Sequence, residues 1–177
     1  MKKTIQLYPV LLLLFSCSYT AEQKQKTNLS YFDVKGYFEK EVDRLKKSNS
    51  LVYKTVEVNG SSETKKIKIA DWKKELAVFS EADINKDSWR GLFKLSRQQD
   101  KETYISDNEK VPVKEIEISY TLNKVSKLLV VIKNNNSLYT SSDSLFYYPD
   151  TLYKIVKSQQ IKLLSDKNYK VTGRFQQ

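Results

Sequence analysis

The sequence predicts an α+β fold: a curved antiparallel sheet of about six to eight strands with one or two helices packed on one face. Two segments, near residues 34–47 and 71–83, repeat apolar residues at helical spacing. The C-terminal half instead alternates apolar and polar residues in short runs separated by turn residues. The 177 residues are enough for one domain.

The beginning of the chain has a different pattern from this domain. Lys2 and Lys3 are followed by an apolar run from Tyr8 to Phe15. This run is shorter than the about 20 apolar residues that a permanent transmembrane helix needs. A positive start, a short apolar run and a small residue, in that order, are typical of a secretory signal. We therefore expect residues 1–16 to be a signal peptide that is removed on export.

The end of the signal resembles the lipobox of bacterial lipoprotein precursors, which signal peptidase II cleaves. Leu14 is the aliphatic residue, Ser16 the small residue and Cys17 the residue after the cleavage point, while Phe15 is bulkier than usual. The resemblance covers only this first segment, and it implies that Cys17 becomes the acylated first residue. More than one acyl chain, at about 0.8 kcal/mol per buried methylene, makes membrane anchoring stable. An ordinary signal peptide with an incidental cysteine is the alternative.

The residues around the cysteine also imply an address. The Leu-Phe-Ser-Cys-Ser junction and the Lys- and Asn-rich composition resemble small Bacteroidetes-type envelope lipoproteins of unknown function. Ser18 stands where an Asp resembles an inner-membrane retention signal, which implies the outer membrane. Acidic residues after the cysteine resemble a surface-export signal, and Glu22 alone is present here, which favours the periplasmic face. Residues 17–30 are then the lipidated cysteine and a polar tether with a root-mean-square reach of about 20 Å.

Residues 31–177 are the predicted globular domain, which begins with a helix. Asp33 is a suitable N-cap, and Phe32 and Tyr37 occupy the two positions of a hydrophobic staple. The apolar stripe of this helix consists of Val34, Phe38, Val42 and Leu45. A second helix is expected over residues 71–83, with Asp71 as its cap. Its stripe consists of Trp72, Leu76 and Phe79.

The remaining elements are predicted strands. Residues 51–58 and 65–69 flank Asn59-Gly60, which is a hairpin signal, and Val52, Val56 and Val58 share one expected dry face. Later strands are expected at about 101–106, 112–122, 126–133, 137–148, 151–164 and 168–175. Continuous apolar residues from Leu128 to Ile132 predict a strand that is covered on both faces.

The composition excludes several classes of chemistry. The chain has no His, Cys17 is its only Cys, and its four Gly are isolated. Catalysis by His or a thiol, His-ligated zinc and glycine-rich phosphate loops are therefore excluded. The net charge is +10, or +8 without the signal. The basic residues are scattered and form no run of five, which argues against nucleic acid binding. Attraction to anionic head groups or glycans suits such a surface better.

Carboxylates are the main remaining candidates for catalysis or metal binding; a Lys–Ser dyad is also open, but Lys and Ser are too common in this chain to single out a pair. A pair among Asp71, Glu75, Glu81, Asp83 and Asp87 would have the groups needed to hydrolyse a glycoside. The segment from Asp83 to Asp87 is similar to the start of a calcium loop, but Ser88 and Leu95 replace the required Gly and Glu. Caps and surface charges are the simpler interpretation, so we expect no catalytic residue, no metal and no cofactor.

Aromatic residues are the candidates for binding. Tyr and Trp combine an apolar body with a polar tip, which suits sugar stacking and wet interfaces. The candidate binding aromatics are Trp89, Tyr139, Tyr147 and Tyr148. Phe146 and Tyr148 share one strand face while Tyr147 points to the other, so core filling and cross-strand pairing are the alternative.

Together these observations predict a membrane-anchored envelope lipoprotein that acts as a non-enzymatic binding or accessory module for a protein or glycan partner. One alternative is a carrier of an apolar ligand or lipoprotein in a cavity between sheet and helices. A core filled by Phe38, Trp72 and Phe79 would count against that carrier. The other alternative is a carboxylate-dependent hydrolase, which requires two carboxylates in one cleft.

Overall fold

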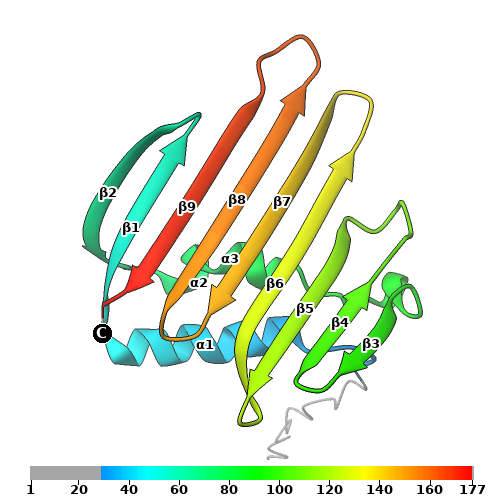
Figure 1. Ribbon diagram of the computed structural model, residues 1–177, viewed down its shortest axis with the longest axis horizontal. Coiled ribbons are helices and arrows are strands. Elements are labelled where there is room, and N and C mark those ends of the chain that lie inside the picture. Colours follow the sequence, from blue (N-terminus) through cyan, green and yellow to red (C-terminus); the bar gives the residue numbers. More distant parts are fainter. Residues whose placement is uncertain (1–28, 177) are drawn as a thin grey trace, which may run out of the picture.

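Nine antiparallel strands form one sheet in residues 29–176, the part of the chain that the computed structural model describes. The predicted signal peptide, its recognition residues Leu14 and Ser16, and the lipidation site Cys17 lie outside the described residues. Figure 1 shows the strands as one layer, with the helices grouped on a single face. The α+β class and the antiparallel sheet with helices are therefore confirmed, whereas the predicted strand number was too low.

The strands follow one another as a meander, with one long-range pairing between β1 and β9. Their bounds are β1 Leu51–Val58, β2 Ser61–Lys68, β3 Lys94–Gln98, β4 Lys101–Ile105, β5 Val113–Thr121, β6 Lys124–Asn135, β7 Tyr139–Tyr148, β8 Leu152–Ile161 and β9 Lys167–Phe175. Across the sheet their order is β2-β1-β9-β8-β7-β6-β5-β4-β3. The last strand, β9, thus lies between β8 and β1 and joins the N-terminal hairpin to the meander.

The strand that the sequence analysis missed is β3. All five of its residues are exposed, so burial imposes no alternation of apolar and polar residues. It is defined instead by its pairing with β4, from Lys94 opposite Ile105 to Gln98 opposite Lys101. Because it lies at the edge of the sheet, neither face of the strand needs an apolar pattern.

The first helix, α1, spans Val34–Ser48 and agrees with its prediction. Asp33 accepts a hydrogen bond from the backbone N–H of Gly36, as an N-cap does. The rings of Phe32 and Tyr37 lie 5.8 Å apart, which completes the staple. The four residues of the predicted stripe are all buried against the sheet.

The second predicted helix is divided in two. Helix α2 spans Trp72–Glu75 and α3 spans Ala77–Glu81, with a short 3-10 turn, η1, at Asp87–Trp89. The break falls at Leu76, whose φ of −99° and ψ of 9° are not helical. Because Trp72, Leu76 and Phe79 are nonetheless all buried, the apolar spacing was correct and only the continuity of the helix was wrong.

The core lies between these helices and one face of the sheet. Phe38 of α1, Phe79 of α3 and Tyr147 of β7 are buried and in mutual contact, with ring centroids 4.9–6.0 Å apart. Trp72 packs beside Tyr153 and Phe175. Large aromatic side chains therefore fill the space between the helix layer and the central strands.

The strands extend beyond the helix layer at the end where β6 turns into β7 and β8 turns into β9 (Figure 1). Val52 is buried, but Val56 and Val58 are each 40% exposed. We expected these three residues to share a dry face; they do share a face, yet only Val52 lies beneath the helices. The two turns at this end carry Leu138 and Leu163, which are also exposed.

The apolar run in β6 does not lie in a strand covered on both faces, contrary to our expectation. Leu128 and Val130 are buried on the helix side, whereas Leu129 and Val131 are half-buried on the other side. Within residues 29–176, no helix packs over that other side (Figure 1). The run thus indicates one buried face and one face that is apolar but open.

Candidate binding face

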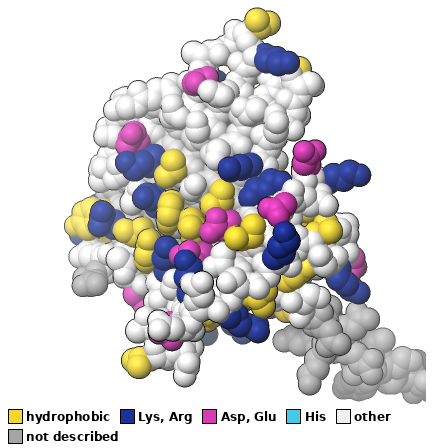
Figure 2. Space-filling model, turned by 45° about the vertical axis from the view of Figure 1, so that its right-hand side comes forward, with side chains coloured by type: hydrophobic (Ala, Val, Ile, Leu, Met, Phe, Trp, Pro, Cys, Tyr) yellow, Lys and Arg dark blue, Asp and Glu magenta, His cyan; other side chains and the backbone are white. Residues whose placement is uncertain are grey.

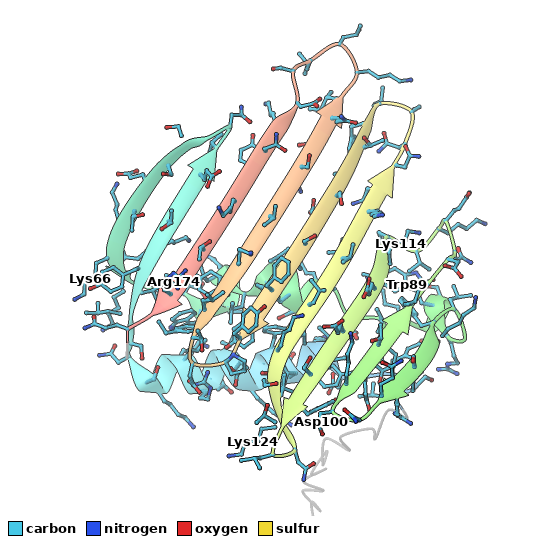
Figure 3. The ribbon with its side chains drawn as sticks, viewed as in Figure 1. Lys66, Trp89, Asp100, Lys114, Lys124 and Arg174 are labelled. Atoms are coloured by element: carbon cyan, nitrogen blue, oxygen red, sulfur yellow. The ribbon has the colours of Figure 1, made fainter. Side chains whose placement is uncertain are left out.

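The face of the sheet that is turned away from the helices is the candidate site, and we call it the open face. Residues directly opposite each other on neighbouring strands point to the same side of a sheet. The register therefore assigns each strand residue to a face: Leu129 lies opposite Phe146, and Phe146 lies opposite Lys154. Figure 3 shows this face toward the viewer, with the helices behind it.

The middle of the open face is apolar and aromatic. Its side chains are half-buried by their neighbours, and none is fully covered. They are Leu129 and Val131 of β6, Phe146 and Tyr148 of β7, and Leu152 and Val156 of β8. The ammonium group of Lys154 lies 4.5 Å from the centroid of the Phe146 ring, within range of a cation–π contact.

Cationic side chains surround this apolar strip. They are Lys66 and Lys68 of β2, Lys170 and Arg174 of β9, Lys154 of β8, Lys124, Lys127 and Lys133 of β6, Lys101 of β4 and Lys94 of β3. The only carboxylates that the register places among them are Glu57, Glu115 and Glu117. Figure 2 shows hydrophobic side chains interspersed with charged ones over the middle of the molecule.

The best-paired carboxylate of the open face is Glu117. It lies 2.5 Å from Lys101 and 2.9 Å from Lys127, one on each neighbouring strand. The hydrogen bonds from these two lysines lower the pKa of Glu117 below its usual value. Glu57 forms a similar cross-strand pair with Lys170, at 3.1 Å. These pairs link strands and leave most of the cations of the open face without a carboxylate beside them.

The predicted binding aromatics do not form one site. Tyr148 lies on the open face, half-buried, as the alternation predicted. Tyr147 is fully buried beneath α1, so it belongs to the core and is closed to a surface ligand. Tyr139 lies at the other end of β7, on the helix side. Trp89 is half-buried in η1, beneath the ammonium group of Lys86 at 4.1 Å.

Tyr147 and Tyr153 connect the sheet to the helix layer through hydrogen bonds. The Tyr147 hydroxyl donates to Glu41 of α1 at 2.5 Å, and the Tyr153 hydroxyl donates to Glu75 of α2 at 2.6 Å. Arg44 and Lys54 complete the two clusters as ion-pair partners of Glu41 and Glu75. Burial, followed by the neighbouring carboxylate, raises the pKa of each tyrosine well above its usual value.

Four of the five candidate carboxylates each have a separate structural partner. Asp71 accepts from the backbone N–H of Lys74 and caps α2. Glu75 is held by Tyr153, and Asp83 accepts from the backbone N–H of Asn85. Asp87 forms an exposed ion pair with Arg90 at 2.9 Å, and Glu81 is exposed at the end of α3.

A groove of about 550 Å³ does lie between Tyr31 and the segment that holds Asp83 and Asp87. Within residues 29–176, however, no three His, Cys, Asp or Glu side chains come together as a metal site would require. In this groove the carboxylate of Asp33 caps α1, and the side-chain oxygen of Asn85 accepts from the backbone N–H of Tyr31. Its polar groups therefore hold the local structure together.

Sequence reasoning missed the basic character of the open face. Each of the six contributing strands shows only one to three cations on this face, as in Lys66 and Lys68 or Lys170 and Arg174. Their gathering depends on the strand order, above all on the pairing of β9 with β1, which are far apart in the sequence. Counting the charges at alternate positions of each strand could have revealed this basic face. That count requires knowing which residues of neighbouring strands lie opposite each other.

Among the described residues, no helix has the length and hydropathy needed to span a membrane. Comparison with protein-family models, curated proteins and solved structures found no match for this chain.

Proposed function

We propose that this chain is a membrane-anchored envelope lipoprotein whose folded domain acts as a non-enzymatic binding module. The observation that supports a binding role is the open face: an apolar and aromatic strip, rimmed by cations, that no described helix covers. An exposed apolar surface within a charged rim is typical of an interaction site. The lipobox-like segment ending at Cys17 supports the anchor.

The packing does not support the two alternatives. A carrier of apolar ligands needs space between sheet and helices, and that space is filled by Phe38, Phe79 and Tyr147. A hydrolase needs two carboxylates facing one reaction centre. Glu75 and Asp83 instead each hold a different part of the local structure.

The proposed location is the outer membrane, with the domain in the periplasm. Leu29 and Ser30 begin the described chain, and Tyr31 packs against Phe93 and Tyr104, close to the β3–β4 end of the sheet. A polar tether over residues 17–30, as the sequence predicts, would keep the domain within about 20 Å of the bilayer.

Site-specific photo-crosslinking in native envelopes tests the binding role. A benzophenone amino acid is placed at Tyr148 on the open face or at Lys40 on the outer side of α1, which is equally accessible to bulk solvent or more so. Adducts at position 148 and none at position 40 are expected. Adducts at 40 alone, or equal adducts at both positions, would contradict binding through the open face.

Mass spectrometry of the mature chain, with and without an inhibitor of signal peptidase II, tests the anchor. The expected N-terminal residue is Cys17 carrying acyl chains, and the inhibitor should leave the signal attached. An unmodified Cys17, or cleavage at another residue, would contradict anchoring while leaving the crosslinking result intact.

A further inference from the structure

The open face has more cations than carboxylates, and this excess accounts for most of the net charge of the described domain. Residues 29–176 contain 27 Lys and Arg against 20 Asp and Glu. The open face carries ten of those cations and three of the carboxylates, as assigned by the strand register. The register does not assign loop residues to a face, and one loop carboxylate, Asp107, pairs with Lys94 of the open face at 3.0 Å. The open face therefore has a large excess of cations even with Asp107 counted.

The cations are spread widely over this side. They come from six of the nine strands and reach from one edge of the sheet to the other. At about 4.8 Å between strands, the sheet is roughly 40 Å wide. Figure 3 labels three of them: Lys66 of β2 and Arg174 of β9 flank Tyr53 of β1, whereas Lys124 lies well away from both, at the beginning of β6. A small anion would touch one or two such groups, whereas an extended anionic surface would reach all of them at once.

The side chains between the cations suit the same kind of surface. Tyr53 and Phe146 lie beneath the ammonium groups of Lys66 and Lys154, at 5.4 and 4.5 Å. Tyrosine places a polar tip over an apolar ring, and lysine extends a charge on a flexible apolar stem, and both are favoured at the boundary between water and lipid. Flexible stems also allow lysines on a twisted sheet to reach a flat surface.

From this charge complementarity we infer that the open face lies against an anionic phospholipid bilayer, with its lysines on the lipid head groups. The inference deepens the proposed function and rests on it, because the anchor at Cys17 would hold the domain near such a surface. Each cation within reach strengthens association with an anionic leaflet by about fivefold. Dissolved ions screen this attraction, whose range is about 8–10 Å at ordinary ionic strength, so the association weakens as salt is raised.

Lysine footprinting of the full chain on vesicles tests the inference. An amine-reactive reagent labels the chain mixed with phosphatidylcholine vesicles, with or without about 30% phosphatidylglycerol. On the anionic vesicles, labelling of the open-face lysines Lys66, Lys124 and Lys133 should fall at least about threefold. Labelling of Lys35, Lys40 and Lys47 on α1 should stay unchanged. Equal protection of both sets, or protection of neither, would overturn the inference.

Two charge-matched variants supply the control. One removes four exposed cations of the open face: Lys66→Gln, Lys124→Gln, Lys133→Gln and Arg174→Gln. The other removes four exposed cations of the helix side: Lys35→Gln, Lys40→Gln, Lys47→Gln and Lys73→Gln. Protection of the remaining open-face lysines, Lys68 and Lys170, should disappear in the first variant and persist in the second. Loss in both variants would show an effect of net charge alone and would overturn the inference.

A soluble acidic polymer distinguishes a bilayer from an acidic partner. Polyglutamate at the same charge concentration should protect the open-face lysines less than the anionic vesicles do. Stronger protection by polyglutamate than by vesicles would overturn the inference that the open face binds a bilayer, and would favour an acidic protein partner instead. Because labelling compares lysines within one chain, it tests the open face whether or not Cys17 is acylated, and mass spectrometry of Cys17 tests the anchor separately.

Discussion

Tyr147 and Tyr148 are neighbours in the sequence whose side chains lie on opposite faces of the sheet. Tyr147 is buried and donates a hydrogen bond to Glu41, whereas Tyr148 is half-buried on the open face. Tyr147→Phe should lower the free energy of unfolding by about 1–2 kcal/mol, because it leaves the Glu41 carboxylate without one of its buried partners. Urea denaturation measures this change.

Tyr148→Phe is the matched control for that substitution. It removes the same hydroxyl from a side chain that faces solvent, so the free energy of unfolding should change by less than about 0.5 kcal/mol. Equal losses in the two variants would contradict the assignment of Tyr147 as a fastening residue between α1 and the sheet.

Leu122 is a residue whose replacement should stabilise the domain. It begins the two-residue turn between β5 and β6, has a φ of 50° and is 91% exposed. Such left-handed conformations favour Gly or Asn over a branched side chain. Leu122→Gly should therefore raise the thermal midpoint, by an amount equivalent to about 0.5–1 kcal/mol. A lower midpoint, measured by circular dichroism, would show that the leucine side chain has a stabilising contact.

At the scale of the elements, β3 is the weakest part of the sheet. It pairs only with β4, and all its residues are exposed, whereas β7 pairs on both sides and carries buried residues. Local opening should therefore expose the amides of β3 without unfolding the sheet. Hydrogen exchange should be at least about 100-fold faster in Lys94–Gln98 than in the middle of β7. Similar rates in both strands would contradict this order of stability.

The elements also show how far sequence reasoning extended. The first helix was predicted in full, because its cap, staple and stripe are local signals within one segment. The break at Leu76 was missed, since tertiary packing keeps Trp72 and Phe79 buried without a continuous helix. Edge strand β3 was missed because residues exposed on both faces carry no periodic pattern.

The candidate site was only partly predictable for a related reason. Alternation along one strand correctly assigned Phe146 and Tyr148 to one side and Tyr147 to the other. The cations that join Phe146 there, such as Arg174 and Lys66, come from strands that are distant in the sequence. No local pattern specifies that β9 pairs with β1. The charges of the open face can therefore be counted only once the strand order is known.

At the scale of the whole molecule, the buried tyrosines predict sensitivity to alkaline pH. Burial and the adjoining carboxylates raise the pKa of Tyr37, Tyr147 and Tyr153 well above the ordinary value of 10.0, and that of Tyr104 to about 12. The unfolded chain therefore loses these phenolic protons before the folded domain does. The stability they contribute is fully present below pH 10 and is lost as the pH rises above it.

Urea midpoints measured between about pH 8 and pH 11 test this dependence. The midpoint should fall steeply above about pH 10. A double variant, Tyr147→Phe with Tyr153→Phe, should be less stable at neutral pH but should show a shallower alkaline fall. The same slope in the wild type and the double variant would show that other groups, such as the lysines, cause the loss.

The extension of β6–β9 past the helix layer has a consequence for engineering the protein. At this far end the open face carries polar residues such as Thr140, Ser142 and Gln160, and the buried residues of the other face, Ser141 and Asp143, are polar as well. The hairpin ends are held by backbone pairing and by polar side-chain hydrogen bonds, such as those from Asn134 to Ser141 and from Gln160 to Asp166, and no hydrophobic face fixes their register. The segment from Lys162 to Asp166 is exposed throughout. A fluorophore or epitope grafted there would report on the domain in living cells while leaving its core and its positive side undisturbed.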